Sequence, residues 1–98
     1  MKTLTGKQKR TLRGLGHHLK ALVQVGQRGI HAAVIEKVDE ELENHELVKI
    51  KIGQDCLDDT KAAANALAEA TESAVVQTIG RTLILYRARL KDPEIKLS

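Results

Sequence analysis

Hydrophobic residues first recur at helical spacing, in the segment that follows Thr5. Leu12, Leu15 and Leu19 lie three and four residues apart and predict an inward-facing helical stripe. Thr5, followed three residues later by Gln8, is the sequence signature of a capping box and marks the start of this helix. Two glycines in the run GLGHH weaken helical structure, so we expect the helix to end there.

The pattern then alternates between strand and helix. Residues 21–25 (ALVQV) and 46–52 (ELVKIKI) alternate apolar and polar positions, as half-buried strands do. In the second of these strands we expect Lys49 and Lys51 to face outward. Between the two strands, apolar residues four positions apart predict a long amphipathic helix from about 31 to 44.

The second half of the chain predicts one more helix and a hairpin. Residues 58–73 form the best helix-forming segment, and Asp58 and Asp59 lie at its N-terminal end, where carboxylates favour the helix dipole. We expect its buried side to be mostly alanine, made of Ala62, Ala63, Ala66 and Ala70 with Leu67. Two further strands, AVVQTI and TLILYRA, flank a tight connection at Gly80-Arg81.

The predicted order is therefore helix, strand, helix, strand, helix, strand, strand. Helices that cross over between strands, followed by a hairpin, imply an α/β fold with a mixed four-stranded sheet. A chain of 98 residues suits one compact domain. We expect this domain to span residues 1–90, and residues 91–98, which include the one proline, to be a loosely ordered tail.

Composition bounds the class of protein. No apolar run approaches the roughly 20 residues that span a bilayer, and the first residues, MKTLTGKQKR, lack the apolar segment of a secretory signal. The lone Cys56 allows no internal disulfide and suits a reducing compartment. We therefore expect a cytoplasmic protein that does not contact a membrane. We also expect it to be a monomer. Tyr86 is the only aromatic residue, which argues against RNA binding by base stacking on aromatic rings.

Charge is segregated along the chain. Residues 1–35 carry seven basic and no acidic residues, residues 36–78 carry four basic and eleven acidic residues, and residues 79–98 carry five basic and two acidic residues. This segregation suggests a face that binds a polyanion and an opposite, solvated acidic side. The alternative is undirected drift of charge over a small surface.

The glycine loop, Gly26-Gln27-Arg28-Gly29, joins the first strand to the second helix. Glycines permit close approach of the backbone or a positive φ, and the first turn of a helix presents unpaired N–H groups. Residues 30–35 contain no acid, whereas acids gather toward the other end of the helix, against the helix dipole. Local helix stability does not explain this distribution. Phosphate binding does, and an ordinary tight turn is the alternative.

We expect neither a catalytic nor a metal site, and therefore no cofactor, no small-molecule substrate and no enzymatic activity. Neither zinc-finger spacing nor an H-E-x-x-H motif occurs among the potential metal ligands, which are His17, His18, His31, His45 and Cys56. His17 and His18 suit the end of the first helix, where positive charge is favourable. His31, beside the glycine loop, either contacts phosphate or packs on the surface. The chain contains neither a P-loop nor a G-x-G-x-x-G motif.

Three segments together resemble the YhbY-like family of small bacterial proteins that consist of a single CRM (chloroplast RNA splicing and ribosome maturation) domain. They are LRGLGHHLKALVQVGQRGI, LENHELVKIKI and VVQTIGRTLILYR, and the resemblance covers about residues 4–88. It implies a fold similar to the C-terminal domain of bacterial translation initiation factor three. It also implies RNA binding and association with precursors of the large ribosomal subunit.

The family's proposed RNA contact corresponds to the glycine loop, and the basic first helix is a natural extension of that surface. We therefore expect RNA to contact the loop, the helix cations and two flanking residues, which are Gly26, Gln27, Arg28, Gly29, Lys7, Lys9, Arg10, Arg13, Lys20 and His31. The chain departs from the family in having Ala21 where a proline often follows the lysine. It also has Gln27 in place of a lysine, so that Arg28 supplies the charge of the loop.

The leading hypothesis is a non-enzymatic RNA-binding protein that acts in large-subunit assembly and binds large-subunit ribosomal RNA through its phosphates. Four further cations are weaker candidates for RNA contacts, namely Lys49, Lys51, Arg81 and Arg87. One alternative is a protein-interaction module whose acidic second helix binds a basic ribosomal protein. A DNA-binding domain is another alternative, because phosphate contacts alone do not separate DNA from RNA.

Overall fold

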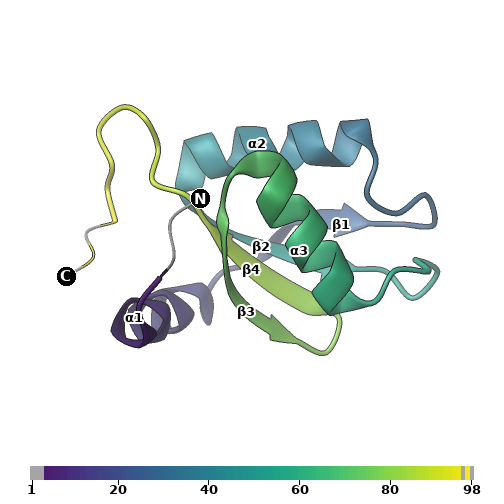
Figure 1. Ribbon diagram of the computed structural model, residues 1–98, viewed down its shortest axis with the longest axis horizontal. Coiled ribbons are helices and arrows are strands. Elements are labelled where there is room, and N and C mark those ends of the chain that lie inside the picture. Colours follow the sequence, from purple (N-terminus) through teal and green to yellow (C-terminus); the bar gives the residue numbers. More distant parts are fainter. Residues whose placement is uncertain (1–3, 96, 98) are drawn as a thin grey trace.

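The computed structural model describes residues 4–95 and 97. The elements, in chain order, are α1 (Gly6–Gly16), β1 (Ala21–Val25), α2 (Ala32–His45), β2 (Leu47–Ile52), α3 (Thr60–Thr71), β3 (Ala74–Ile79) and β4 (Thr82–Tyr86). The predicted α/β fold with three helices and a mixed four-stranded sheet is confirmed (Figure 1).

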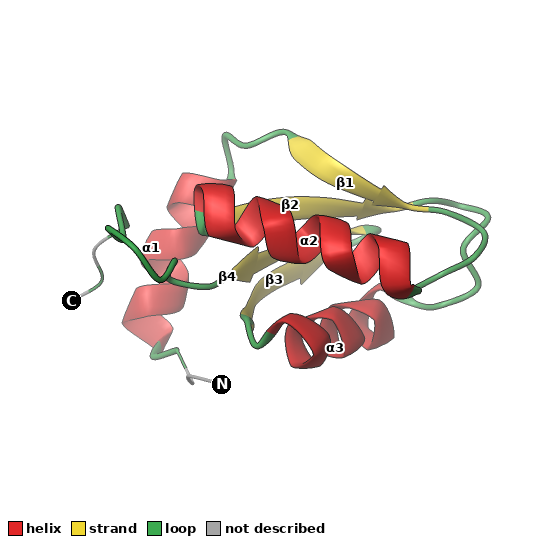
Figure 2. Ribbon diagram, turned by 90° about the horizontal axis from the view of Figure 1, so that it is seen from above, coloured by secondary structure: helices red, strands yellow, loops and turns green. Residues whose placement is uncertain are grey.

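The sheet has the strand order β1-β2-β4-β3. β1 and β2 are parallel and are joined by the α2 crossover, whereas β4 is antiparallel to both β2 and β3. Helices α2 and α3 cover one face of the sheet and α1 covers part of the other (Figures 1 and 2). Because β1 and β2 run in the same direction, the loops that follow them lie side by side, and the Gly53 N–H donates to the Val25 carbonyl at 2.8 Å.

Two hydrophobic cores hold these layers together. The larger core lies between the sheet and the α2–α3 layer and includes Val25, Val38, Leu42, Ile50, Leu67 and Leu85. The smaller core lies under α1 and consists of Leu12, Leu47, Val76 and Ile84. β2 contributes to both cores, since Leu47 is buried on one face of the strand and Val48 on the other.

The predicted stripe on α1 is correct at Leu12 and wrong at the other two leucines. Leu12 is fully buried, whereas Leu15 is 47% exposed and Leu19 is 37% exposed. α1 lies against the sheet through Leu12 and Gly16, one helical turn apart. A Cβ atom on Gly16 would lie 2.7 Å from Ile84 Cδ1, so the missing side chain allows this close approach.

The predicted alanine face of α3 is wrong at three of its five positions. Ala63 and Leu67 are buried as expected, but Ala62, Ala66 and Ala70 are exposed. The buried positions are Ala63, Ala64, Leu67, Ala68 and Thr71, which face β3, β4 and α2. Alanine occurs on several sides of this helix, so periodicity alone does not identify the side that packs.

The helix ends follow the sequence signals. Thr5 and Gln8 form the predicted capping box, with the Gln8 N–H donating to Thr5 Oγ1 at 3.1 Å. Asp59 caps α3, because its Oδ1 accepts a hydrogen bond from the Ala62 N–H at 2.7 Å. His17 is the C-cap of α1, as its position in the chain predicts.

Glu46 connects the segment after β4 to the end of α2. Its carboxylate is 1% exposed and accepts hydrogen bonds from the N–H groups of Arg89, Glu94 and Ile95. Burial alone raises the pKa of Glu46, but the three N–H groups and the charge of Arg89 more than offset burial and lower that pKa. In the same segment, Ile95 and Leu97 pack against the smaller core. The predicted domain limit at residue 90 stays a prediction.

Candidate nucleic-acid interface

The glycine loop forms a tight turn at the end of β1. The Gly29 N–H donates to the Gly26 carbonyl at 3.0 Å, and Gly29 has a φ of 68°, which glycine adopts without the penalty of a Cβ atom. Gly26, Gln27 and Arg28 are exposed. Arg28 makes no hydrogen bond or ion pair with another residue in the described part of the chain, which leaves its guanidinium available to a ligand.

The helix that follows the loop begins without a side-chain cap. His31 is the N-cap, but its side chain makes no capping hydrogen bond, and the first turn of α2 contains no acid. Ala32 and Ala33 are exposed in this turn. The N-terminus of α2 therefore presents its N–H groups and its partial positive charge beside Arg28.

Asp58 lies against the glycine loop, although it is distant in the sequence. A Cβ atom on Gly29 would lie 2.9 Å from Asp58 Oδ2, which places this carboxylate at the edge of the turn. The sequence predicts Asp58 only at the start of α3 and not beside the loop. The parallel pairing of β1 with β2 was the available signal, because it brings the loops after the two strands together. The negative charge of Asp58 offsets part of the positive potential of the loop.

The cations of α1 do not lie next to the glycine loop. Lys7, Arg10 and Arg13 are exposed and Lys9 is partly exposed, on a helix that packs against the other face of the sheet. Figures 1 and 2 both place α1 and the loop toward opposite ends of the long axis. Lys20 precedes the five-residue strand β1 and Gly26 follows it, so their Cα atoms are about 20 Å apart at ~3.3 Å per residue. The predicted surface is thus divided into two separate sites, the cluster of cations on α1 and the glycine loop with its single cation, Arg28.

The chain matches the family model of the CRS1 / YhbY (CRM) domain over residues 4–87. It belongs to this family. The chain is 43% identical to the "Probable RNA-binding protein YqeI" of Bacillus subtilis (strain 168) over 94 residues, which are 96% of this chain and 98% of that protein. An "RNA-binding protein" of Haemophilus influenzae is 40% identical over 89% of this chain and 88% of its own length.

A solved structure shares the fold of this CRM domain. The solution structure of protein SAV1595 from Staphylococcus aureus aligns with a TM-score of 0.83 and 44% sequence identity. The alignment covers 98% of this chain and 100% of that chain. The arrangement of three helices and four strands described above is therefore the arrangement of a known relative.

Charge segregation along the sequence becomes charge segregation across the sheet of the CRM domain. α1 carries four cations and no acid, and Lys49 and Lys51 project from β2 on the same side of the sheet. α2, on the opposite side, carries five acids and one lysine. A polyanion would therefore meet positive charge on the α1 side and negative charge on the α2 side.

Arg81 is one of the four further candidates for RNA contacts, and it joins distant segments of the CRM domain. The Arg81 guanidinium donates to the carbonyls of Ile52, Gly53 and Cys56 and so fastens the loop after β2 to the β3–β4 hairpin. The sequence did not predict this role of Arg81, because its partners are backbone carbonyls about 25 or more residues away. RNA contact by Arg81 stays a prediction.

Arg87 joins β4 to α2 and α3. Its Nη1 donates to Asp39 Oδ1 at 2.6 Å and to the Thr71 carbonyl at 2.9 Å, and Nη2 lies 3.5 Å from Glu43 Oε1. Two of the acids of α2 therefore have an internal partner. RNA contact by Arg87 likewise stays a prediction.

Metal ligation and membrane spanning can both be checked on the described residues. Within residues 4–95 and 97, no three His, Cys, Asp or Glu side chains gather closely enough to hold a metal. No helix of that same part is long and apolar enough to cross a membrane.

Proposed function

We propose that this CRM domain is an RNA-binding protein that associates with precursors of the large ribosomal subunit and assists their assembly. The glycine loop carries the proposal, because Arg28, which has no partner among the described residues, adjoins a helix N-terminus without an acidic residue. The names of the relatives support RNA as the partner. The ribosomal part rests on the resemblance to YhbY-like proteins.

In this proposal, RNA phosphates bind at two places. Arg28 pairs with one phosphate through two hydrogen bonds, and the loop backbone and the first turn of α2 complete that site. Lys7, Arg10 and Arg13 neutralise further phosphates at the α1 cluster. Since the chain has a single aromatic residue, recognition relies on the backbone and shape of RNA more than on ring stacking.

The test is binding of purified protein to fragments of large-subunit ribosomal RNA over a series of salt concentrations, with Arg28→Glu beside wild type. We expect wild-type affinity to fall steeply with salt, by roughly 0.7–0.9 log units per neutralised phosphate for each log unit of salt. Arg28→Glu should bind more weakly and with a flatter slope. Lys37→Glu, which makes the same change of charge on the acidic side of the molecule, should match wild type.

Binding no stronger than that of a neutral control protein would overturn the proposal. If Arg28→Glu and Lys37→Glu behaved alike, the glycine loop would be a turn and nothing more.

The acidic α2 helix supports a second candidate function, binding of a basic ribosomal protein. Glu36 and Glu40 are exposed and make no hydrogen bond or ion pair with another described residue, whereas Asp39 and Glu43 contact Arg87. A Glu36→Lys, Glu40→Lys double variant therefore tests the surface without breaking the Arg87 contacts. Loss of association with ribosomal particles, with unchanged affinity for isolated RNA, would favour this second function.

A further inference from the structure

The sheet face next to α1 is only partly covered. α1 packs near Leu47, Val76 and Ile84. The remainder of that face bears mostly polar side chains, and none of the described helices lies over them (Figure 1). Strand pairing places four neighbouring side chains in one row across this remainder, which are Gln24, Lys51, Thr82 and Ile79. A second row, closer to α1, contains Lys49, Ile84 and Gln77. We call the residues Gln24, Lys49, Lys51, Gln77, Ile79 and Thr82 the open sheet face.

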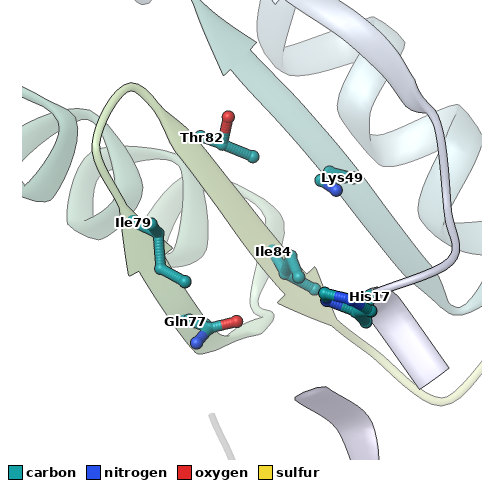
Figure 3. Close-up of a pocket in the computed structure, with 6 residues that line it drawn as sticks. All are labelled: His17, Lys49, Gln77, Ile79, Thr82 and Ile84. Carbon is teal, nitrogen blue, oxygen red and sulfur yellow. The ribbon is translucent and has the colours of Figure 1, made fainter. Parts of the chain in front are cut away.

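A shallow pocket lies where the open sheet face meets the end of α1. Its volume is about 180 Å³, and Figure 3 shows the side chains that line it, namely His17, Lys49, Gln77, Ile79, Thr82 and Ile84. They come from α1's C-cap and three strands, so the pocket depends on the docking of α1 through Gly16. Lys49 Nζ donates to the Leu19 carbonyl at 3.4 Å, which ties the segment after α1 to this face.

The chemistry of the open sheet face suits a nucleic-acid strand. Lys49 and Lys51 supply positive charge, and none of the six side chains is acidic. The amides of Gln24 and Gln77 can each donate and accept hydrogen bonds, as the edge of a nucleobase requires. Ile79 is 63% exposed and provides an apolar contact for a base or a ribose.

The open sheet face also lies between the cations of α1 and the glycine loop. Lys20 and Lys49 line a neighbouring, larger pocket at the α1 end. Lys51 pairs with Gln24 near the end of β1, one residue before the strand leads into the glycine loop. A strand of RNA that contacts both α1 and the glycine loop therefore has a path across Lys49 and Lys51.

We propose that the open sheet face binds an unpaired RNA strand, with Lys51 on its phosphates and Gln24, Gln77 and Thr82 on its base edges. The inference rests on the proposed RNA-binding function and names the form of RNA that this surface takes. An unpaired strand fits better than a duplex, because its Watson–Crick base edges are free to bond with the amides, whereas an A-form helix pairs those edges and keeps its major-groove edges in a deep, narrow groove. Charge favours this face over the α2 side, where acids would repel phosphate.

The test uses fluorescence anisotropy with a labelled single-stranded RNA of about 12 nucleotides, a length in the range that single-strand sites occupy. The same sequence closed into a hairpin serves as the paired probe. The variants are Lys51→Gln and Gln77→Ala, and Lys61→Gln on α3 is the matched control for loss of one exposed lysine. Circular dichroism and thermal unfolding establish that each variant is folded.

We expect Lys51→Gln to weaken binding of the single strand about threefold to fivefold, as loss of one exposed ionic contact does. Its salt slope should fall by about 0.7, because one phosphate contact is lost. Gln77→Ala should weaken single-strand binding with an unchanged salt slope, since it removes a hydrogen bond and no charge. Lys61→Gln should match wild type with both probes.

Three results overturn the inference in different ways. If wild type binds neither probe, the proposed RNA-binding function falls along with the inference. If Arg28→Glu weakens binding while Lys51→Gln and Gln77→Ala match wild type, the function stands and the open sheet face is not part of the site. If wild type binds only the hairpin, the surface does not take an unpaired strand.

Discussion

Asp58 shows how a single charged residue can alter the electrostatic potential at the glycine loop. Its carboxylate lies at the edge of the turn, close to Gly29, while Arg28 supplies the positive charge of the loop. A phosphate bound there would be attracted by Arg28 and by the N-terminus of α2, and repelled by Asp58. The balance between these charges sets how strongly the loop binds an anion.

Replacing Asp58 with asparagine tests this balance. If RNA phosphate lies at the loop, Asp58→Asn should raise RNA affinity by about twofold to fivefold, the scale of one exposed charge interaction. The gain should shrink as salt is added, because screening weakens the repulsion that the mutation removes. Titration of labelled ribosomal RNA measures the effect, and Glu69→Gln, an exposed acid on α3, is the control. Equal affinities for Asp58→Asn and wild type would place the phosphate elsewhere.

Glu46 is a second residue whose environment predicts a measurable effect. Its folded-state pKa lies below the ordinary value of 4.5, so its carboxylate stabilises the fold above that pH. This contribution is lost as the pH falls from about 4.5 through the folded-state pKa. The residue is buried and binds three backbone N–H groups of the segment after β4.

Glu46→Gln should lower the free energy of unfolding at pH 7 by about 1–3 kcal/mol, because an amide oxygen replaces a charged acceptor. Urea unfolding at several pH values measures this loss, and the difference between variant and wild type should narrow below pH 4.5. Glu69→Gln again serves as the control. A difference that stays constant from pH 7 to pH 3 would contradict the role of the Glu46 charge.

At the scale of elements, sequence patterns predicted the kind and order of each helix and strand but not every buried face. Thr5 and Gln8 marked the start of α1 correctly because capping is a local interaction. The face of α1 depends on its partner, and the sheet receives it through Leu12 and Gly16. Leucine periodicity cannot report a contact made by a residue that has no side chain.

The contrast between two leucines of α1 tests this docking. Leu12→Ala should lower the free energy of unfolding by about 2–5 kcal/mol, because it leaves a cavity in the smaller core. Leu15→Ala should cost well under half as much, since Leu15 is 47% exposed. Chemical denaturation of both variants gives the comparison. Equal losses would show that α1 packs along the leucine stripe instead.

At the scale of the whole molecule, the tertiary structure separates the cations of α1 from the glycine loop, which the sequence predicts to form one surface. Lys20 and Gly26 lie about 20 Å apart at the two ends of β1. α1 and the glycine loop lie toward opposite ends of the long axis (Figures 1 and 2). A long RNA can contact the α1 cations and the glycine loop at once, whereas a short fragment reaches only one of these two sites. The open sheet face provides the path between them.

Combining Arg13→Glu with Arg28→Glu tests the separation. Residues this far apart and without shared partners act independently, so their losses of binding free energy should add for a long ribosomal RNA fragment. For a fragment of about 4 nucleotides, at the short end of single-strand sites, one of the two variants should have little effect. Measuring the affinity of wild type, the two single variants and the double variant for both RNA lengths tests these two expectations. Strong non-additivity with the long fragment would indicate a single shared site.

The sequence by itself determined the order of the elements, the capping box of α1, the charge segregation and the position of the glycine loop. These depend on residues close together in the chain, such as Thr5 with Gln8, or on simple counts of charge. Only the tertiary structure decided that Asp58 lies against Gly29, that Arg81 and Arg87 fasten distant segments, and that α1 leaves part of the sheet open. Each of these depends on how β1, β2 and β4 pair, which brings together residues that no local pattern connects.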